Sequence, residues 1–135
     1  MRSPPQRASA LRLVAAISGL YDLFVGALLL FATEHMAAWF GVRPPVPEIQ
    51  ADLNGLFLLA VGAGYIMPYR DPLRHRGYLW VMGPFLKGAG AALFIFDYLT
   101  RDSPVSYLLF AASDGALALV TLWALLTQRD GPAGA

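Results

Sequence analysis

Four long stretches of this sequence contain almost no charged residues. They run from about residue 13 to 33, 53 to 69, 78 to 100 and 105 to 127. A stretch of about 18 or more apolar residues can cross the hydrocarbon core of a membrane as an α-helix. A soluble helical bundle would need polar helix faces, and these stretches have almost none. The sequence therefore predicts an all-α bundle of four transmembrane helices.

The composition agrees with this prediction and excludes several kinds of function. Hydrophobic residues make up 57% of the 135 residues, and charged residues make up 14%, whereas soluble domains usually carry about 25% charged residues. The formal net charge of +1 gives no basis for binding nucleic acid. Because the sequence has no cysteine, disulfides, thiolate metal sites and cysteine nucleophiles are excluded. We predict no metal site and no cofactor.

The loops on the two sides of the predicted bundle carry unequal numbers of arginines. One side has seven of them: Arg2, Arg7, Arg12, Arg70, Arg74, Arg76 and Arg129. The other side has two, Arg43 and Arg101. Because arginine-rich loops stay in the cytoplasm, both termini are predicted to be cytoplasmic. Residues 1–12 would form an amino-terminal tail, residues 13–127 the transmembrane domain, and residues 128–135 a flexible carboxyl tail.

The loop from residue 34 to 52 is predicted to lie on the outer side. In it, Met36, Trp39 and Phe40 have i, i+3, i+4 spacing, which favours a short helix in the membrane interface with these side chains in the lipid. The proline-rich segment 42–47 cannot extend this helix. Two interpretations stay open for the loop: a stiff connector, which we favour, or a cap over the outer mouth of the bundle.

Small residues indicate which helix faces touch, because membrane helices associate through close packing of such residues. Five glycines are predicted to lie at helix contacts: Gly19, Gly26, Gly55, Gly62 and Gly90. Ala32 and Ala124 lie near span ends and are expected to tolerate larger side chains better. Pro84 removes a backbone hydrogen bond inside the third span and predicts a kink there.

Three ionisable residues, Asp22, Lys87 and Asp114, lie near the middle of their spans. At about 1.5 Å of rise per residue, they fall within roughly 5 Å of one depth. An unpaired charge there costs about 2.5–3.5 kcal/mol, so the three side chains should meet inside the bundle. Their formal charge is −1 unless one carboxyl is protonated. Two roles stay open: fixing which helices pair, or binding a ligand or a proton.

Two further polar residues, Asn54 and Asp97, lie nearer the outer side. Asp97 is expected above Lys87, on a helical face shared with Phe94. Asn54 begins the second span at a similar depth. Together they predict a polar track that leads from the outer surface to the bundle centre, in a pocket open to one side. The candidates for binding a ligand or a proton are Lys87, Asp22, Asp114, Asp97 and Asn54, and no catalytic residue is predicted.

Three motifs connect the sequence to a known group of proteins. They are Gly19-Leu20-Tyr21-Asp22-Leu23, then Phe40-Gly41-Val42 followed by Pro45 and Pro47, and then Leu53-x-Gly55-Leu56-Phe57-Leu58-Leu59 with Gly62 and Tyr65. In these motifs the chain resembles small bacterial four-helix membrane proteins of the broad DoxX-like group. The resemblance implies the four-helix fold and a bacterial inner membrane. Some DoxX proteins are tied to thiol or quinone redox systems, and the lack of cysteine speaks against a thiol role here.

The first functional prediction is a non-enzymatic accessory or small-ligand-binding membrane protein built around the buried Asp22, Lys87 and Asp114. An alternative is a dimeric proton-coupled exporter of small molecules, although Lys87 would neutralise the acid that such a transporter needs. A third is a membrane enzyme acting on a lipid or quinone, which no motif supports. The predicted partners are the lipid bilayer, further copies of the chain or a larger membrane complex, and a lipid or quinone ligand.

Overall fold

The computed structural model describes residues 4–128, and the regular elements in this range are all helices. In chain order they are α1 (Pro4–Phe31), α2 (Thr33–Phe40), α3 (Ile49–Gly64), α4 (Ile66–Arg70), α5 (Arg76–Trp80), the π-helix η1 (Val81–Lys87), α6 (Gly88–Thr100), the 3-10 helix η2 (Val105–Tyr107) and α7 (Leu108–Thr127). The predicted all-α fold is therefore confirmed. The expected flexible tail lies, from residue 129 onward, outside the described residues.

Neighbouring helices join into longer apolar rods. Four stretches of the described residues are long and apolar enough to cross a membrane: Ala8–Phe31, Ile49–Arg70, Arg76–Thr100 and Val105–Thr127. The first begins earlier than the expected residue 13, because helix α1 continues toward the amino terminus. The second and third also begin earlier than expected, at residues 49 and 76, because polar residues such as Gln50, Asp52 and Arg76 already belong to the helices.

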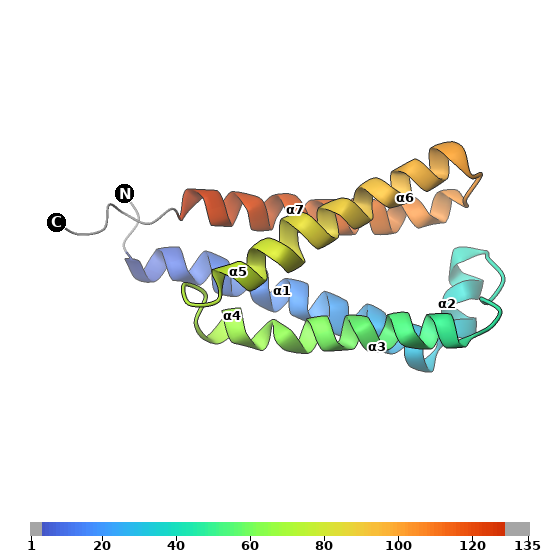
Figure 1. The fold of residues 1–135 in the computed structure, drawn as a ribbon, viewed down its shortest axis with the longest axis horizontal. Helices are drawn as coiled ribbons and strands as arrows, with labels where there is room; N and C mark the ends of the chain where they lie inside the picture. The colour runs from blue at the N-terminus through green and yellow to red at the C-terminus, as the bar shows by residue number, and fades with distance from the viewer. Residues whose placement is uncertain (1–3, 129–135) are drawn as a thin grey trace.

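The rods pack as two pairs. Helix α1 lies against α3 and α4, while α6 and η1 lie against α7 (Figure 1). The two pairs meet at the end that holds α5, where α1 and α5 both contact α7. Toward the other end the pairs diverge, and α2 lies across that end (Figure 1). We call these the α5 end and the α2 end of the bundle.

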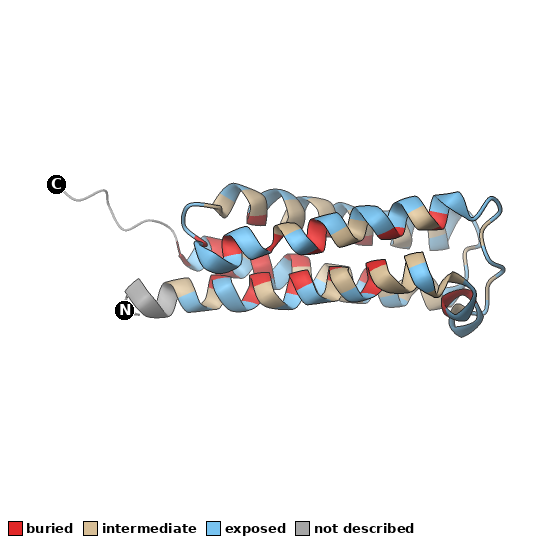
Figure 2. Cartoon of the chain, turned by 90° about the horizontal axis from the view of Figure 1, so that it is seen from below, coloured by how far each residue is buried: buried red, intermediate tan, exposed pale blue. Residues whose placement is uncertain are grey.

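Large apolar side chains cover the outside of the bundle, as expected for a surface in contact with lipid. Leu20, Phe24, Phe85 and Leu119 are each between 64% and 71% exposed. Figure 2 shows exposed residues along the outer faces and buried residues where the helices face one another. Soluble proteins rarely expose apolar surface on this scale. Together with the four apolar stretches, this surface identifies the chain as a multi-pass membrane protein.

Glycines bring α1 and α3 into backbone contact. A Cβ atom built at Gly26 would lie 2.8 Å from the carbonyl oxygen of Gly55, and one built at Gly55 would lie 2.8 Å from that of Gly26. About two helical turns before Gly26, a Cβ at Gly19 would lie 3.2 Å from the carbonyl oxygen of Gly62. No larger residue fits between these helices without moving a backbone. This pair is therefore the place where glycines bring the backbones of two helices together.

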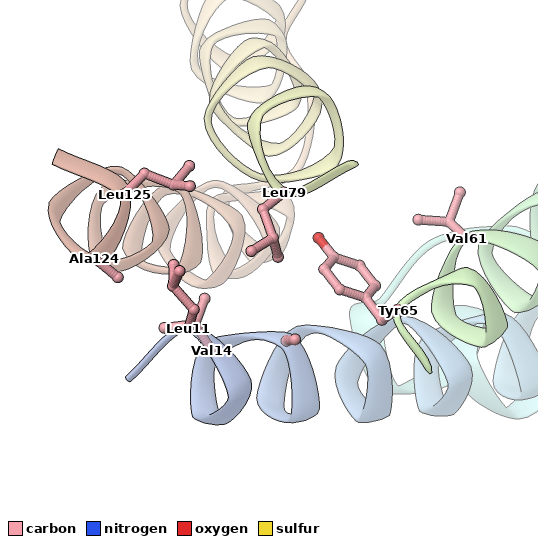
Figure 3. Close-up of a cluster of buried hydrophobic side chains, with 8 residues drawn as sticks. Leu11, Val14, Val61, Tyr65, Leu79, Ala124 and Leu125 are labelled. Atoms are coloured by element: carbon pink, nitrogen blue, oxygen red, sulfur yellow. The ribbon is translucent and has the colours of Figure 1, made fainter. Parts of the chain in front are cut away.

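An apolar cluster at the α5 end holds the two pairs together. It consists of Leu11, Val14, Ala15, Val61, Tyr65, Leu79, Ala124 and Leu125 (Figure 3). Ala124 is 0% exposed inside this cluster although it lies near a span end, so a larger side chain there would have to displace its neighbours. Arg76 also binds the end of α7, donating hydrogen bonds of 2.9 Å to the carbonyl oxygens of Leu125 and Gln128. These carbonyls would otherwise have no partner within their helix.

The third rod contains a π-helical segment around Pro84. Proline has no backbone N–H and cannot complete the α-helical hydrogen-bond pattern. Here the irregularity extends over Val81–Lys87 as the π-helix η1. Such segments change the direction in which the following side chains point. Lys87, the last residue of η1, is 4% exposed and points into the bundle.

Candidate functional site

The three ionisable residues that were expected to meet do so. The Nζ atom of Lys87 donates a hydrogen bond of 2.5 Å to Oδ1 of Asp22 and lies 3.8 Å from Oδ1 of Asp114. Asp22 is 1% exposed, and the side chain of Asp114 is 19% exposed. Three different elements supply them: α1, η1 and α7. We call Asp22, Lys87 and Asp114 the charged cluster.

The two carboxylates are held in different ways. Asp22 is fully enclosed and makes the short contact to the ammonium, whereas Asp114 is farther from it and partly accessible. The second oxygen of Asp22, Oδ2, has no hydrogen-bond partner among the described residues. A buried carboxylate oxygen normally has one, because leaving it unpaired is unfavourable. The charged cluster therefore retains capacity to accept a further hydrogen bond.

Sequence reasoning missed two neighbours of the charged cluster. The ring of Tyr21 lies with its centroid 5.0 Å from the Lys87 Nζ atom, a cation–π distance. Its hydroxyl shares a hydrogen bond of 2.6 Å with the Ser113 hydroxyl, which links α1 to α7. The signal was present in the sequence, since Tyr21 directly precedes Asp22 and Ser113 directly precedes Asp114.

A cavity of about 660 Å³ lies between the two helix pairs and reaches the charged cluster. Asp22, Lys87 and Asp114 line its inner end, which we call the floor. Its walls are mainly apolar and include Val25, Leu29, Leu58, Leu86, Phe94 and Phe110. The glycine contacts close α1 onto α3, and the cluster at the α5 end joins the pairs there. The open space between the two helix pairs therefore lies toward the α2 end.

Helix α2 and the segment that follows it cover the outer end of the cavity. Met36 is 6% exposed, and Phe40 lines the cavity with its ring stacked on that of Phe110 at 4.8 Å. The Ser106 hydroxyl donates a hydrogen bond of 2.7 Å to the Phe40 carbonyl. The prediction that Met36 and Phe40 lie in lipid is thus wrong. Trp39, the third residue of that prediction, is 68% exposed and can lie in lipid.

The way α2 ends explains this cap. Gly41 adopts a left-handed conformation with φ of 66° and stops the helix there. The next amide, that of Val42, turns back to bind the carbonyl of Ala37 at 3.0 Å. This ending pairs the carbonyls of Ala37 and Ala38. It also lays the following segment over the cavity, where Val42, Arg43 and Pro45 line it. Of the two open interpretations of this loop, the structure favours the cap.

In the outer half of the predicted polar track, the structure agrees with the prediction for one residue and differs for the other. Asn54 lines the cavity as expected, together with Gln50 and Arg43, and all three are exposed. We call these three residues the mouth. Asp97 does not line this cavity. It pairs with Arg101 at 3.2 Å and accepts a hydrogen bond from the Ser103 hydroxyl at the turn after α6.

Helix geometry accounts for the position of Asp97. At about 100° per residue, Phe94 is only about 20° from the direction of Lys87, whereas Asp97 is about 80° away. Phe94 accordingly lines the cavity, and Asp97 faces a separate, smaller hollow at the surface of α6. Of the five candidate residues, the structure brings four to one cavity and places the fifth outside it.

Within residues 4–128, no three histidine, aspartate or glutamate side chains gather as a metal site would require. The chain also matches no protein-family model, no curated protein and no solved structure. The resemblance to the DoxX-like group therefore stays a prediction. What the protein does follows best from the chemistry of the cavity.

Proposed function

We propose that this membrane protein binds a small, mainly apolar ligand in the cavity between its helix pairs, without catalysing a reaction. The observation that carries the proposal is a 660 Å³ cavity whose apolar walls lead to three polar groups on its floor. Ligand sites are typically cavities of about 300–1,000 Å³ that combine apolar walls with a few convergent polar groups. A drug-sized molecule or part of a lipid fits this volume.

The position of the charged cluster supports binding over a purely structural role. An ion pair that only fixes helix pairing is best surrounded by packed side chains, since any gap loses dispersion contacts. Here Asp22, Lys87 and Asp114 all line the open space. The polar groups thus meet a volume that a ligand can fill, and they would fix its orientation.

The alternatives are less well supported by the geometry. A proton-coupled exporter needs an acid that is free to bind its substrate and a proton in turn, but Asp22 is bound to Lys87 at 2.5 Å. A lipid- or quinone-modifying enzyme needs a reactive group beyond the charged cluster, and the cavity walls are mainly apolar. We infer an accessory or ligand-carrying role in the bacterial inner membrane, in keeping with the DoxX-like resemblance, alone or with further copies of the chain.

Filling the cavity should remove the ligand without unfolding the bundle. Gly90 lines the cavity, and a Cβ there meets nothing nearer than 3.7 Å, so Gly90→Phe should fold and place its ring in the open space. We expect native mass spectrometry from nanodiscs to detect a bound lipid or other small molecule on the wild type and none on Gly90→Phe. Ala89→Phe, on the exposed side of α6, is the matched control and should retain the ligand. Equal retention by all three proteins would contradict the proposal.

We further propose that the α5 end faces the cytoplasm, so that the mouth opens on the periplasmic side. The seven-to-two division of arginines supports this orientation. A periplasm-active phosphatase fused after Arg101 should be active, and the same enzyme fused after Arg129 should be silent. The opposite pattern of activities would reverse the orientation of the whole bundle.

A further inference from the structure

The floor of the cavity carries one more negative group than positive groups. Asp22 and Asp114 each contribute a carboxylate, and Lys87 contributes one ammonium, which gives a formal charge of −1. The ammonium lies 2.5 Å from Asp22 but 3.8 Å from Asp114. Because the attraction between charges falls with distance, Lys87 neutralises Asp22 more completely than Asp114.

Asp114 is also the carboxylate that a ligand can reach. Its side chain is 19% exposed, against 1% for that of Asp22. Gly90 of α6 lies opposite Asp114 and has no side chain to cover it. Even a Cβ atom added at Gly90 would be 3.7 Å from Oδ2 of Asp114. Asp22 also lines the floor, and its buried Oδ2 atom has no hydrogen-bond partner among the described residues.

Aromatic rings line the cavity between Asp114 and the mouth. Phe110 lies one turn before Asp114 on α7, with the rings of Phe40 and Phe94 stacked against it at 4.8 and 5.4 Å. The faces of such rings attract cations. The ammonium of Lys87 already lies over the ring of Tyr21 in the same cavity. Besides Lys87, which is counted in the floor, Arg43 is a lining residue that opposes a cation, but it is exposed at the mouth, where solvent and salt screen its charge.

We propose that the ligand of this cavity is a lipophilic organic cation, such as a hydrophobic amine, with Asp114 as its counter-ion. The proposal rests on the proposed function, namely that the cavity binds a small apolar molecule. The apolar walls hold the body of the ligand, the rings line its path, and its positive group balances the excess charge of the floor.

Two probes of nearly equal shape and opposite charge test this assignment. Tetraphenylphosphonium is a cation and tetraphenylborate is an anion. Their binding to the full chain in nanodiscs is measured by equilibrium dialysis, with empty nanodiscs subtracted. We expect the phosphonium to bind at least about tenfold more tightly than the borate, equivalent to about 1.4 kcal/mol. Gly90→Phe should abolish the binding of the phosphonium.

Variants of the acids assign the preference to Asp114. Asp114→Asn should weaken phosphonium binding at least about tenfold, and Asp114→Glu should retain the preference for the cation. Asp97→Asn removes a carboxylate on α6 outside the cavity and should leave the binding of both probes unchanged. If Asp114→Asn fails to fold, two results still test whether the cavity prefers a cation. They are the stronger binding of the phosphonium by the wild type and the loss of that binding in Gly90→Phe.

The outcomes separate this proposal from the proposed function. Borate binding as tight as that of the phosphonium, blocked by Gly90→Phe, would overturn the cation while leaving a ligand-binding cavity. Phosphonium binding that is unchanged in Asp114→Asn would overturn the role of Asp114. Binding of neither probe would overturn the cation proposal, and the ligand retained in native mass spectrometry would then decide the proposed function independently.

Discussion

Replacing Lys87 with methionine is expected to destabilise the protein by about 3–5 kcal/mol, the range found when one partner of a buried ion pair is removed. The ammonium makes the 2.5 Å contact to Asp22, whose side chain is 1% exposed. Without it, two carboxylates would face each other inside the membrane with no positive group between them. Thermal unfolding in mild detergent, read by circular dichroism, measures the loss.

Two further variants show that the charge is responsible for this loss. Arg74→Met removes an exposed positive charge at the turn before α5 and should leave the stability nearly unchanged. The triple variant Lys87→Met, Asp22→Asn, Asp114→Asn removes all three charges and should recover much of the lost stability. It should still lack the ligand if the cavity binds one. A Lys87→Met protein as stable as the wild type would contradict the importance of the buried pair.

Substituting alanine for Gly55 should destabilise the bundle by about 1–3 kcal/mol, the usual effect of overpacking a close contact. The added Cβ would lie 2.8 Å from both the Gly26 carbonyl oxygen and the Leu30 amide nitrogen. Both are backbone atoms, so α1 and α3 would have to move apart as whole helices. The same unfolding measurement in detergent gives the size of the effect.

Gly88→Ala is the matched control, because it makes the same substitution in a helix. A Cβ at Gly88 meets only the Cβ of Ala118, at an ordinary 3.8 Å. Alanine is a better helix former than glycine by about 1 kcal/mol, so this variant should be neutral or slightly more stable. If Gly55→Ala and Gly88→Ala were equally stable, the close contact of α1 with α3 would not hold.

The sequence by itself determined the elements and the meeting of the charges. Apolar runs long enough to cross a membrane form helices, because in lipid each backbone polar group must be bonded within its own segment. Charges at mid-membrane depth must pair, because lipid does not solvate them. These two rules act on local composition and depth, so they predicted the all-α bundle and the contact of Lys87 with Asp22 and Asp114.

The tertiary structure decided which way the other side chains face. A leucine facing lipid and a leucine facing protein look alike in sequence, because both surroundings are apolar. Hydrophobicity therefore did not reveal that Phe40 turns inward or that Ala124 is enclosed. The cavity itself depends on where the helix pairs meet and diverge: glycines join α1 to α3, large side chains join the pairs at the α5 end, and the space left over lies between helices far apart in sequence.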